Sequence, residues 1–139
     1  MREKMDKNLA EVFQEDDVPM IDEEQIEQLM WVSEDGGADL LQELLELFIN
    51  DNLSPLALID EGLDNKDFEI IARQAHSIGG SSANLGGRRL SKVCLSLEKA
   101  AKEESLEVVR VFIPKLKHTY QLTIEALREE IAKAQKTDA

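Results

Sequence analysis

The sequence predicts an all-α protein, folded as an up-and-down antiparallel four-helix bundle with an additional short helix near its N-terminus. Three observations support this prediction. Apolar residues recur with the 3.6-residue period of a helix along nearly the whole chain. No window longer than a few positions alternates apolar and polar residues as a half-buried strand would. The breaks between periodic segments are short, as expected where neighbouring helices run antiparallel.

Residues 1–20 are expected to form an N-terminal extension. Apolar residues at helical spacing predict a short amphipathic helix within it: Met5, Leu9, Val12 and Phe13. The bundle is expected to span residues 21–134. Residues 135–139 are polar and are expected to form a disordered tail.

Asp22 is a candidate N-cap for a helix over about 23–34, which Gly36 and Gly37 would end. Four principal helices are then expected over about 38–61, 65–85, 88–102 and 106–133, with Asp64 or Asn65 capping the second. Pro55 falls inside the first of these four. Since an interior proline costs a helix about 3 kcal/mol, we expect a kink there, or a break with Ser54 capping a new start.

Composition limits the kinds of partner and site. The 139 residues include 29 acidic and 16 basic side chains, a formal net charge of −13, which argues against nucleic acid or a membrane as partner. The charge also predicts a basic or neutral surface on whatever the protein contacts. With one cysteine, Cys94, and no zinc-binding spacing, we expect no metal site. No signal peptide or membrane span is recognisable, so we expect a cytoplasmic, monomeric, single-domain protein.

Gly79 and Gly80 differ from the other glycines in their position. The remaining five of the seven fall at expected helix ends, whereas this pair lies inside the helix expected over 65–85. There each glycine costs about 1 kcal/mol relative to alanine. Two interpretations stay open: a kink or close approach of two backbones, or a functional requirement.

His76 is predicted to be exposed beside these glycines. The apolar stripe of its helix comprises Phe68, Ile71, Ala75, Ile78, Ser82 and Leu85, and the histidine projects roughly 130° away from the centre of this stripe. Its neighbours within about a turn are Ala72, Arg73, Gly79, Gly80 and Ala83, four of which carry at most a methyl group. We expect an open ring, with Ala72 and Ala83 available for docking a partner. A histidine has an ordinary pKa near 6.5, which leaves a neutral, nucleophilic nitrogen at physiological pH.

The run His76-Ser77-Ile78-Gly79-Gly80-Ser81-Ser82-Ala83-Asn84-Leu85-Gly86, followed by Leu90, Cys94, Leu97 and Glu98, resembles the histidine-containing phosphotransfer (HPt) domain. More loosely, the resemblance extends over about residues 22–130. It implies a four-helix bundle whose exposed histidine accepts a phosphoryl group from an aspartate of one receiver domain and passes it to another. By this resemblance His76 is the phosphoacceptor, Gly80 leaves room for the receiver, and Ser81 belongs to the same motif.

The sequence departs from the family in one position, because Gly79 replaces the lysine usual three residues after the histidine. That lysine helps to balance the charge of the phosphoryl group. Arg73 and, as a weaker candidate, Lys102 could replace it, unless each is only a solvated surface cation.

Glu98 is expected at the level of His76. The histidine lies ten residues before Gly86 and the glutamate eleven after Gly87, so the two meet across an antiparallel pair of helices. Glu98 could then accept a hydrogen bond from one imidazole nitrogen and leave the other free to attack. The alternative is an ordinary surface acid.

Three functions are compatible with these features. The favoured one is a phosphocarrier with no turnover or cofactor of its own, serving receiver domains of a hybrid sensor histidine kinase and of a response regulator, with any Mg²⁺ held by the receiver. The second is an adaptor that binds receivers without carrying phosphate, suggested by the missing lysine. The third is an enzyme using His76 as a general base, which we disfavoured because a convex helix face should offer no pocket.

Overall fold

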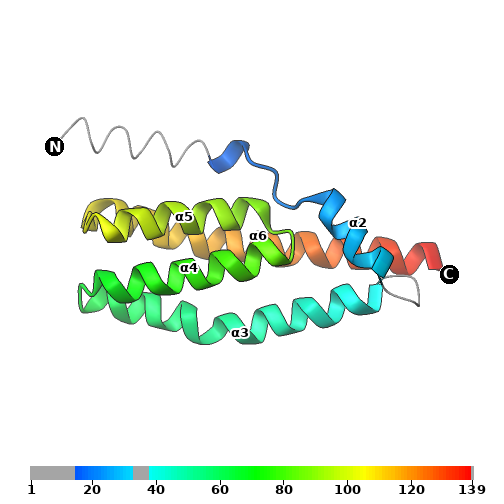
Figure 1. Ribbon diagram of the computed structural model, residues 1–139, viewed down its shortest axis with the longest axis horizontal. Coiled ribbons are helices and arrows are strands. Elements are labelled where there is room, and N and C mark those ends of the chain that lie inside the picture. The colour runs from blue at the N-terminus through cyan, green and yellow to red at the C-terminus, as the bar shows by residue number, and fades with distance from the viewer. Residues whose placement is uncertain (1–14, 33–37, 139) are drawn as a thin grey trace.

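A computed structural model describes residues 15–32 and 38–138, and all its regular structure there is helical (Figure 1). A short 3₁₀ turn, η1 (Glu15–Asp17), is followed by α2 (Glu23–Val32), α3 (Ala38–Asp64), α4 (Phe68–Asn84), α5 (Arg88–Lys102) and α6 (Leu106–Asp138). The amphipathic helix expected around Met5, Leu9, Val12 and Phe13 lies outside the described residues.

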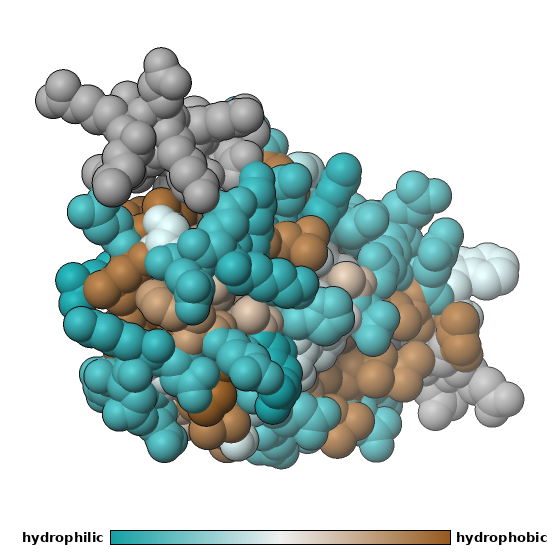
Figure 2. Space-filling model, turned by 60° about the vertical axis from the view of Figure 1, so that its left-hand side comes forward, coloured by the Kyte–Doolittle hydropathy of each residue, from teal (hydrophilic) through white to brown (hydrophobic). Residues whose placement is uncertain are grey.

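The four long helices form the expected up-and-down antiparallel bundle, so the predicted fold class is confirmed. Each of α3 and α5 packs against both α4 and α6. Within the described ranges α3 and α5 are not neighbouring helices, so they occupy diagonal corners of the bundle. Side chains from all four helices fill the core, among them Leu41, Phe48, Ile71, Ile78, Leu90, Leu97, Phe112 and Leu127. Hydrophilic side chains cover most of the face in Figure 2, with apolar patches between them.

The structure decides two points that concern where helices end. Of the two alternatives at Pro55, the structure excludes the break, because α3 runs through this residue from Ala38 to Asp64, held by buried residues on both sides such as Phe48 and Ile59. The tail expected to be disordered from residue 135 instead continues α6 to residue 138. Neither glycine nor proline interrupts the helix-forming residues there, and Ala134 packs against the core.

The helix that carries His76 is fixed at both ends. At its start, the side chain of Asp67, rather than Asp64 or Asn65, caps α4 by accepting a hydrogen bond from the Ile70 backbone N–H at 3.2 Å. At its end, the Gln25 amide of α2 donates to the backbone oxygens of Ala83 and Asn84, at 2.8 and 3.0 Å. The α4 backbone is therefore anchored on either side of the histidine.

Gly86 makes the turn from α4 to α5 with a φ of +84°, a conformation that residues with a side chain rarely adopt. Its backbone oxygen accepts a hydrogen bond from the Asp22 N–H at 2.8 Å, and a Cβ built on it would lie 3.0 Å from the Cδ1 of buried Ile26. A glycine here allows the turn to close beneath α2.

Gly86→Ala should therefore lower the free energy of unfolding by about 1–2 kcal/mol, because alanine is strained at positive φ. The matched control is Gly80→Ala, inside α4, where a Cβ would have no neighbour within 4 Å. This control should raise the free energy of unfolding by about 0.5–1 kcal/mol through better helix propensity. Urea unfolding followed by circular dichroism measures both, and changes of the same sign would contradict the account.

Candidate functional site

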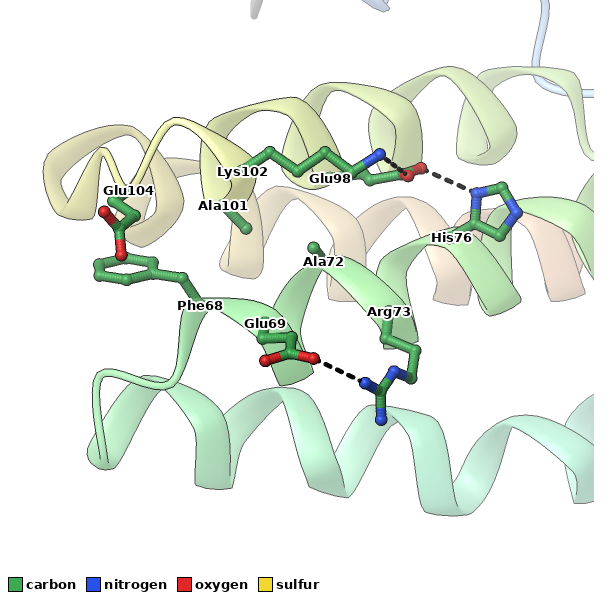
Figure 3. Close-up of a pocket in the computed structure, with 9 residues that line it drawn as sticks. All are labelled: Phe68, Glu69, Ala72, Arg73, His76, Glu98, Ala101, Lys102 and Glu104. Carbon is green, nitrogen blue, oxygen red and sulfur yellow. Dashed lines mark hydrogen bonds and ion pairs between the residues drawn. The ribbon is translucent and has the colours of Figure 1, made fainter.

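His76 stands on the outer side of α4, where it faces Glu98 of α5 (Figure 3). Its side chain is 74% exposed, and its Nδ1 lies 3.0 Å from Glu98 Oε1. The glutamate side chain is only 12% exposed. Sequence spacing thus predicted this pairing correctly, and Glu98 is a largely buried partner of the ring rather than an ordinary surface acid.

Glu98 also binds Lys102, whose Nζ lies 2.8 Å from Oε2. Burial acts to raise the pKa of Glu98, but the hydrogen bonds from Lys102 and His76 outweigh it, and the pKa falls below its ordinary value of 4.5. Glu98 is therefore a carboxylate at neutral pH and can only accept hydrogen bonds. A neutral His76 consequently carries its proton on Nδ1, which leaves the Nε2 lone pair unprotonated.

The two glycines inside α4 have different explanations. Gly79 is buried, and a Cβ there would lie 3.0 Å from the Cβ of Cys94, so this glycine permits the close approach of α4 and α5. Gly80 is exposed, with nothing within 4 Å of an added Cβ. Helix packing accounts for Gly79, whereas packing among the residues that the structure describes gives no reason for Gly80.

Hollows flank the ring on both sides. The larger, about 620 Å³, lies between α4 and α5 and is lined by Phe68, Glu69, Ala72, Arg73, His76, Glu98, Ala101, Lys102 and Glu104 (Figure 3). The smaller, about 180 Å³, includes Gly79, Gly80, Ala83 and Leu95. Our expectation of no pocket beside His76 was wrong, because small residues such as Ala72 and Ala101 leave the space between the helices unfilled. Shape alone therefore no longer argues against a small-molecule reaction.

The two alanines expected to dock a partner differ in exposure. Ala72 is only 8% exposed and packs into the core as part of the floor of the larger hollow, so it offers little docking surface. This corrects the prediction from sequence, which placed Ala72 beside His76 without knowing how closely α5 approaches. Ala83 is exposed and lines the smaller hollow.

Arg73 and Ser81 do not contact the ring. The Arg73 guanidinium pairs with Glu69 at 2.9 Å and extends away from His76 (Figure 3). The Ser81 hydroxyl lies on the α3 side of the helix, where it donates to the Ile78 carbonyl at 3.0 Å and accepts from the Asn52 amide at 3.2 Å. Of the candidate cations, Lys102 is the one that the structure joins to the site.

Asn52 is a residue that the reading of the sequence missed. It is 2% exposed, and its amide also donates to the Phe48 carbonyl at 2.8 Å. The residue ties α3 to α4 one turn beyond His76. Its signal in the sequence was an amide at helical spacing from Phe48 and Ile59, on the buried face of the helix.

Among the residues described, no three His, Cys, Asp or Glu side chains come together as metal ligands. None of the helices described is long and apolar enough to cross a membrane. Cys94 lies in the core, where burial raises the pKa of its thiol.

An exposed histidine on one helix of a four-helix bundle, braced by an acid on the next, agrees with what comparison with known proteins finds. The Hpt domain family matches residues 43–136, and the chain belongs to this family. Histidine-containing phosphotransfer protein 2 of Arabidopsis thaliana is 26% identical over 88 residues, covering 61% of this chain and 56% of that protein. Histidine-containing phosphotransfer protein 5 of the same plant is 24% identical, covering 76% of this chain and 69% of that protein.

Solved structures agree with the fold. The histidine-containing phosphotransfer protein MtHPt2 of Medicago truncatula has a TM-score of 0.73 at 25% identity, over 97% of this chain and 90% of that one. HptB of Pseudomonas aeruginosa PAO1 has a TM-score of 0.72 at 24% identity, over 83% of this chain and 96% of that one.

The Glu98 interactions generate a prediction about pH. Because the pKa of Glu98 is lower in the folded than in the unfolded chain, its carboxylate stabilises the fold above about pH 4.5, and this contribution is lost as pH falls through the folded pKa. Glu98→Gln should therefore lower the free energy of unfolding by about 1 kcal/mol at pH 7 and by much less at pH 3.

The control is Glu69→Gln, which removes the exposed pair with Arg73 and should change stability by less than about 0.5 kcal/mol at either pH. Urea titrations at the two pH values make the comparison. A Glu98→Gln deficit that stays the same at pH 3 would contradict the assignment.

Proposed function

We propose that this protein is a phosphocarrier of a multistep phosphorelay. In this proposal His76 accepts a phosphoryl group from an aspartyl phosphate of one receiver domain and delivers it to an aspartate of another. The observation that carries the proposal is the state of the ring: its Nδ1 lies 3.0 Å from Glu98 Oε1, while the His76 side chain is 74% exposed and lines the smaller hollow together with Gly80. Membership of the Hpt family and the names of the relatives support it.

The chemistry follows from the two ring nitrogens. The Nε2 lone pair attacks phosphorus, the bond from phosphorus to the aspartyl oxygen breaks, and the bonding electrons leave with the aspartate as a carboxylate. The imidazole ring becomes positively charged. Its proton remains on Nδ1, hydrogen-bonded to the Glu98 carboxylate, which stabilises that charge. Transfer to the next receiver reverses these steps. Neither direction consumes a cofactor of this chain.

Charge balance at the phosphoryl group falls to Lys102 in this proposal. Gly79 occupies the position of the usual lysine, and its packing against Cys94 leaves little room for a side chain. Lys102 is joined to His76 through Glu98 and can turn toward a phosphoryl group on Nε2. Arg73 is a second source of positive charge. Its exposed ion pair with Glu69 contributes less than about 1 kcal/mol, so the guanidinium can leave it to contact the phosphoryl group. Any Mg²⁺ would sit in the acidic pocket of the receiver.

The partners in this proposal are receiver domains of a hybrid sensor histidine kinase and of a response regulator, met by a monomer in the cytoplasm. The adaptor hypothesis remains the alternative because of Gly79. It differs in one observable, since an adaptor binds receivers and never carries phosphate.

Incubation with radiolabelled, phosphorylated receiver domains separates the two. The wild type should acquire an acid-labile, alkali-stable label, and His76→Gln should acquire none. His118→Gln is the matched control, because His118 is the chain's other histidine and is exposed on α6; it should be labelled like the wild type. Binding of receivers without label on the wild type would favour the adaptor.

Gly80 tests whether bare backbone beside the ring matters. Gly80→Gln should lower the transfer rate by at least about tenfold, because a long side chain would stand where the receiver must approach, while helix content is kept or raised. Gly80→Ala adds one methyl group and should stay within about threefold of the wild type. Rapid quench-flow assays measure both transfer rates. Equal rates for glutamine and glycine at this position would show that the open surface is irrelevant.

A further inference from the structure

The charge of this protein is divided between helices at opposite corners of the bundle. Helix α3 carries seven acidic residues and no basic one, whereas α5 carries five basic residues and one acid, a net charge of +4 in a chain of −13. These two helices are the diagonal pair, and α4 with His76 lies between them. The overall acidity therefore does not describe the surface beside the histidine.

The cations of α5 gather on its outer side. Residues at successive helical turns form a stripe within about 80° of the helix circumference. We call it the α5 stripe; all its members are exposed: Arg88, Lys92, Leu95, Lys99 and Lys102. Leu95, 55% exposed, is its apolar centre. The stripe combines positive charge with an exposed apolar side chain, which a partner could cover, as in protein interfaces.

One cation of the stripe has no evident role in folding. Arg88 and Arg89 occupy the first turn of α5, which contains no acid, although the helix dipole favours negative charge there. Arg89 has a structural use, since its Nε donates to the Val18 carbonyl at 2.7 Å. Arg88 is exposed, and a glutamate in its place would suit the helix better. Local stability therefore does not explain this cation.

The α5 stripe also borders the site. Leu95 lines the smaller hollow together with His76, Gly80 and Glu98. A partner protein docked over the histidine would therefore also contact the stripe. We propose that the α5 stripe is the surface that selects and orients the receiver domain, by binding an acidic face next to its aspartyl phosphate. This inference rests on the proposed phosphocarrier function. It replaces our expectation of a basic or neutral contact, which used only the total charge.

The diagonal arrangement makes such selection directional. An acidic face is attracted by α5 and repelled by α3, so it is turned toward the α4–α5 side on which His76 stands. Anionic membrane would meet the same stripe, but a chain of −13 is repelled by such a surface as a whole. An acidic protein face small enough to contact α5 alone avoids that repulsion.

The test reverses two charges that lie outside the phosphotransfer machinery, in Arg88→Glu/Lys92→Glu. The matched control, Arg128→Glu/Lys136→Glu, makes the same change in net charge at exposed positions of α6. Label transfer from phosphorylated receivers and binding of the same receivers are measured between 20 mM and 500 mM NaCl. Thermal melts check that both variants fold.

The α5 variant should transfer and bind at least about tenfold more weakly than the wild type at 20 mM salt, and the gap should shrink to about twofold at 500 mM. The control should stay within about threefold of the wild type. Equal behaviour of the α5 variant and either the control or the wild type would overturn the inference. So would binding to phosphatidylserine vesicles that the α5 variant loses, since the stripe would then serve a membrane.

Failure of the proposed function gives a different result. If the wild type binds receivers with this salt dependence but is never labelled, the phosphocarrier proposal fails and the α5 stripe stands as the docking surface of an adaptor. If the wild type is labelled and the α5 variant is labelled equally fast at every salt concentration, the phosphocarrier proposal stands and the stripe has no part in it.

Discussion

The hydrogen bond between His76 Nδ1 and Glu98 Oε1 joins α4 to α5, and the proposed chemistry depends on it. Its length of 3.0 Å is set by how closely the two helices pack, which Gly79 permits by leaving room for Cys94. Lys102 holds the other oxygen of Glu98 and keeps it ionised. Core packing therefore decides which ring nitrogen keeps its proton. The packing of α4 against α5 thus determines which nitrogen of His76 is free to react.

Two residues near the site break local stability rules. Gly80 lies in a helix interior with no packing reason to lack a side chain, and Arg88 places a positive charge at a helix N-terminus. Gly80 lines the smaller hollow beside His76, and Arg88 belongs to the α5 stripe that we propose as the docking surface. By contrast Gly86, whose positive φ requires glycine, serves the fold. The structural glycines and Gly80 differ in what an added Cβ would contact: at Gly79 and Gly86 it would crowd a neighbouring side chain, whereas at Gly80 it would contact nothing within 4 Å.

Much of this could be predicted from the sequence because it depends on periodicity. Helical spacing placed the helices, exposed His76 and put it level with Glu98, since both lie a similar distance from one tight turn. The expectations that were wrong concern distances between helices, which local sequence patterns do not determine. The approach of α5 buries Ala72, and the space between α4 and α5 forms a hollow. The sequence also left a kink or a break open at Pro55, where packing keeps α3 continuous. Total charge also does not show how charge is distributed, because a chain of −13 contains the cationic helix α5.

The proposed chemistry requires that Glu98 holds Nδ1 of His76 and leaves Nε2 to react. Nitrogen-15 NMR of the histidine-labelled protein, recorded after phosphorylation by a phosphorylated receiver, tests this claim most directly, because the spectrum identifies the phosphorylated nitrogen. The account predicts phosphorus on Nε2 of His76, with the proton retained on Nδ1. Phosphorus on Nδ1, or on His118 instead, would contradict it.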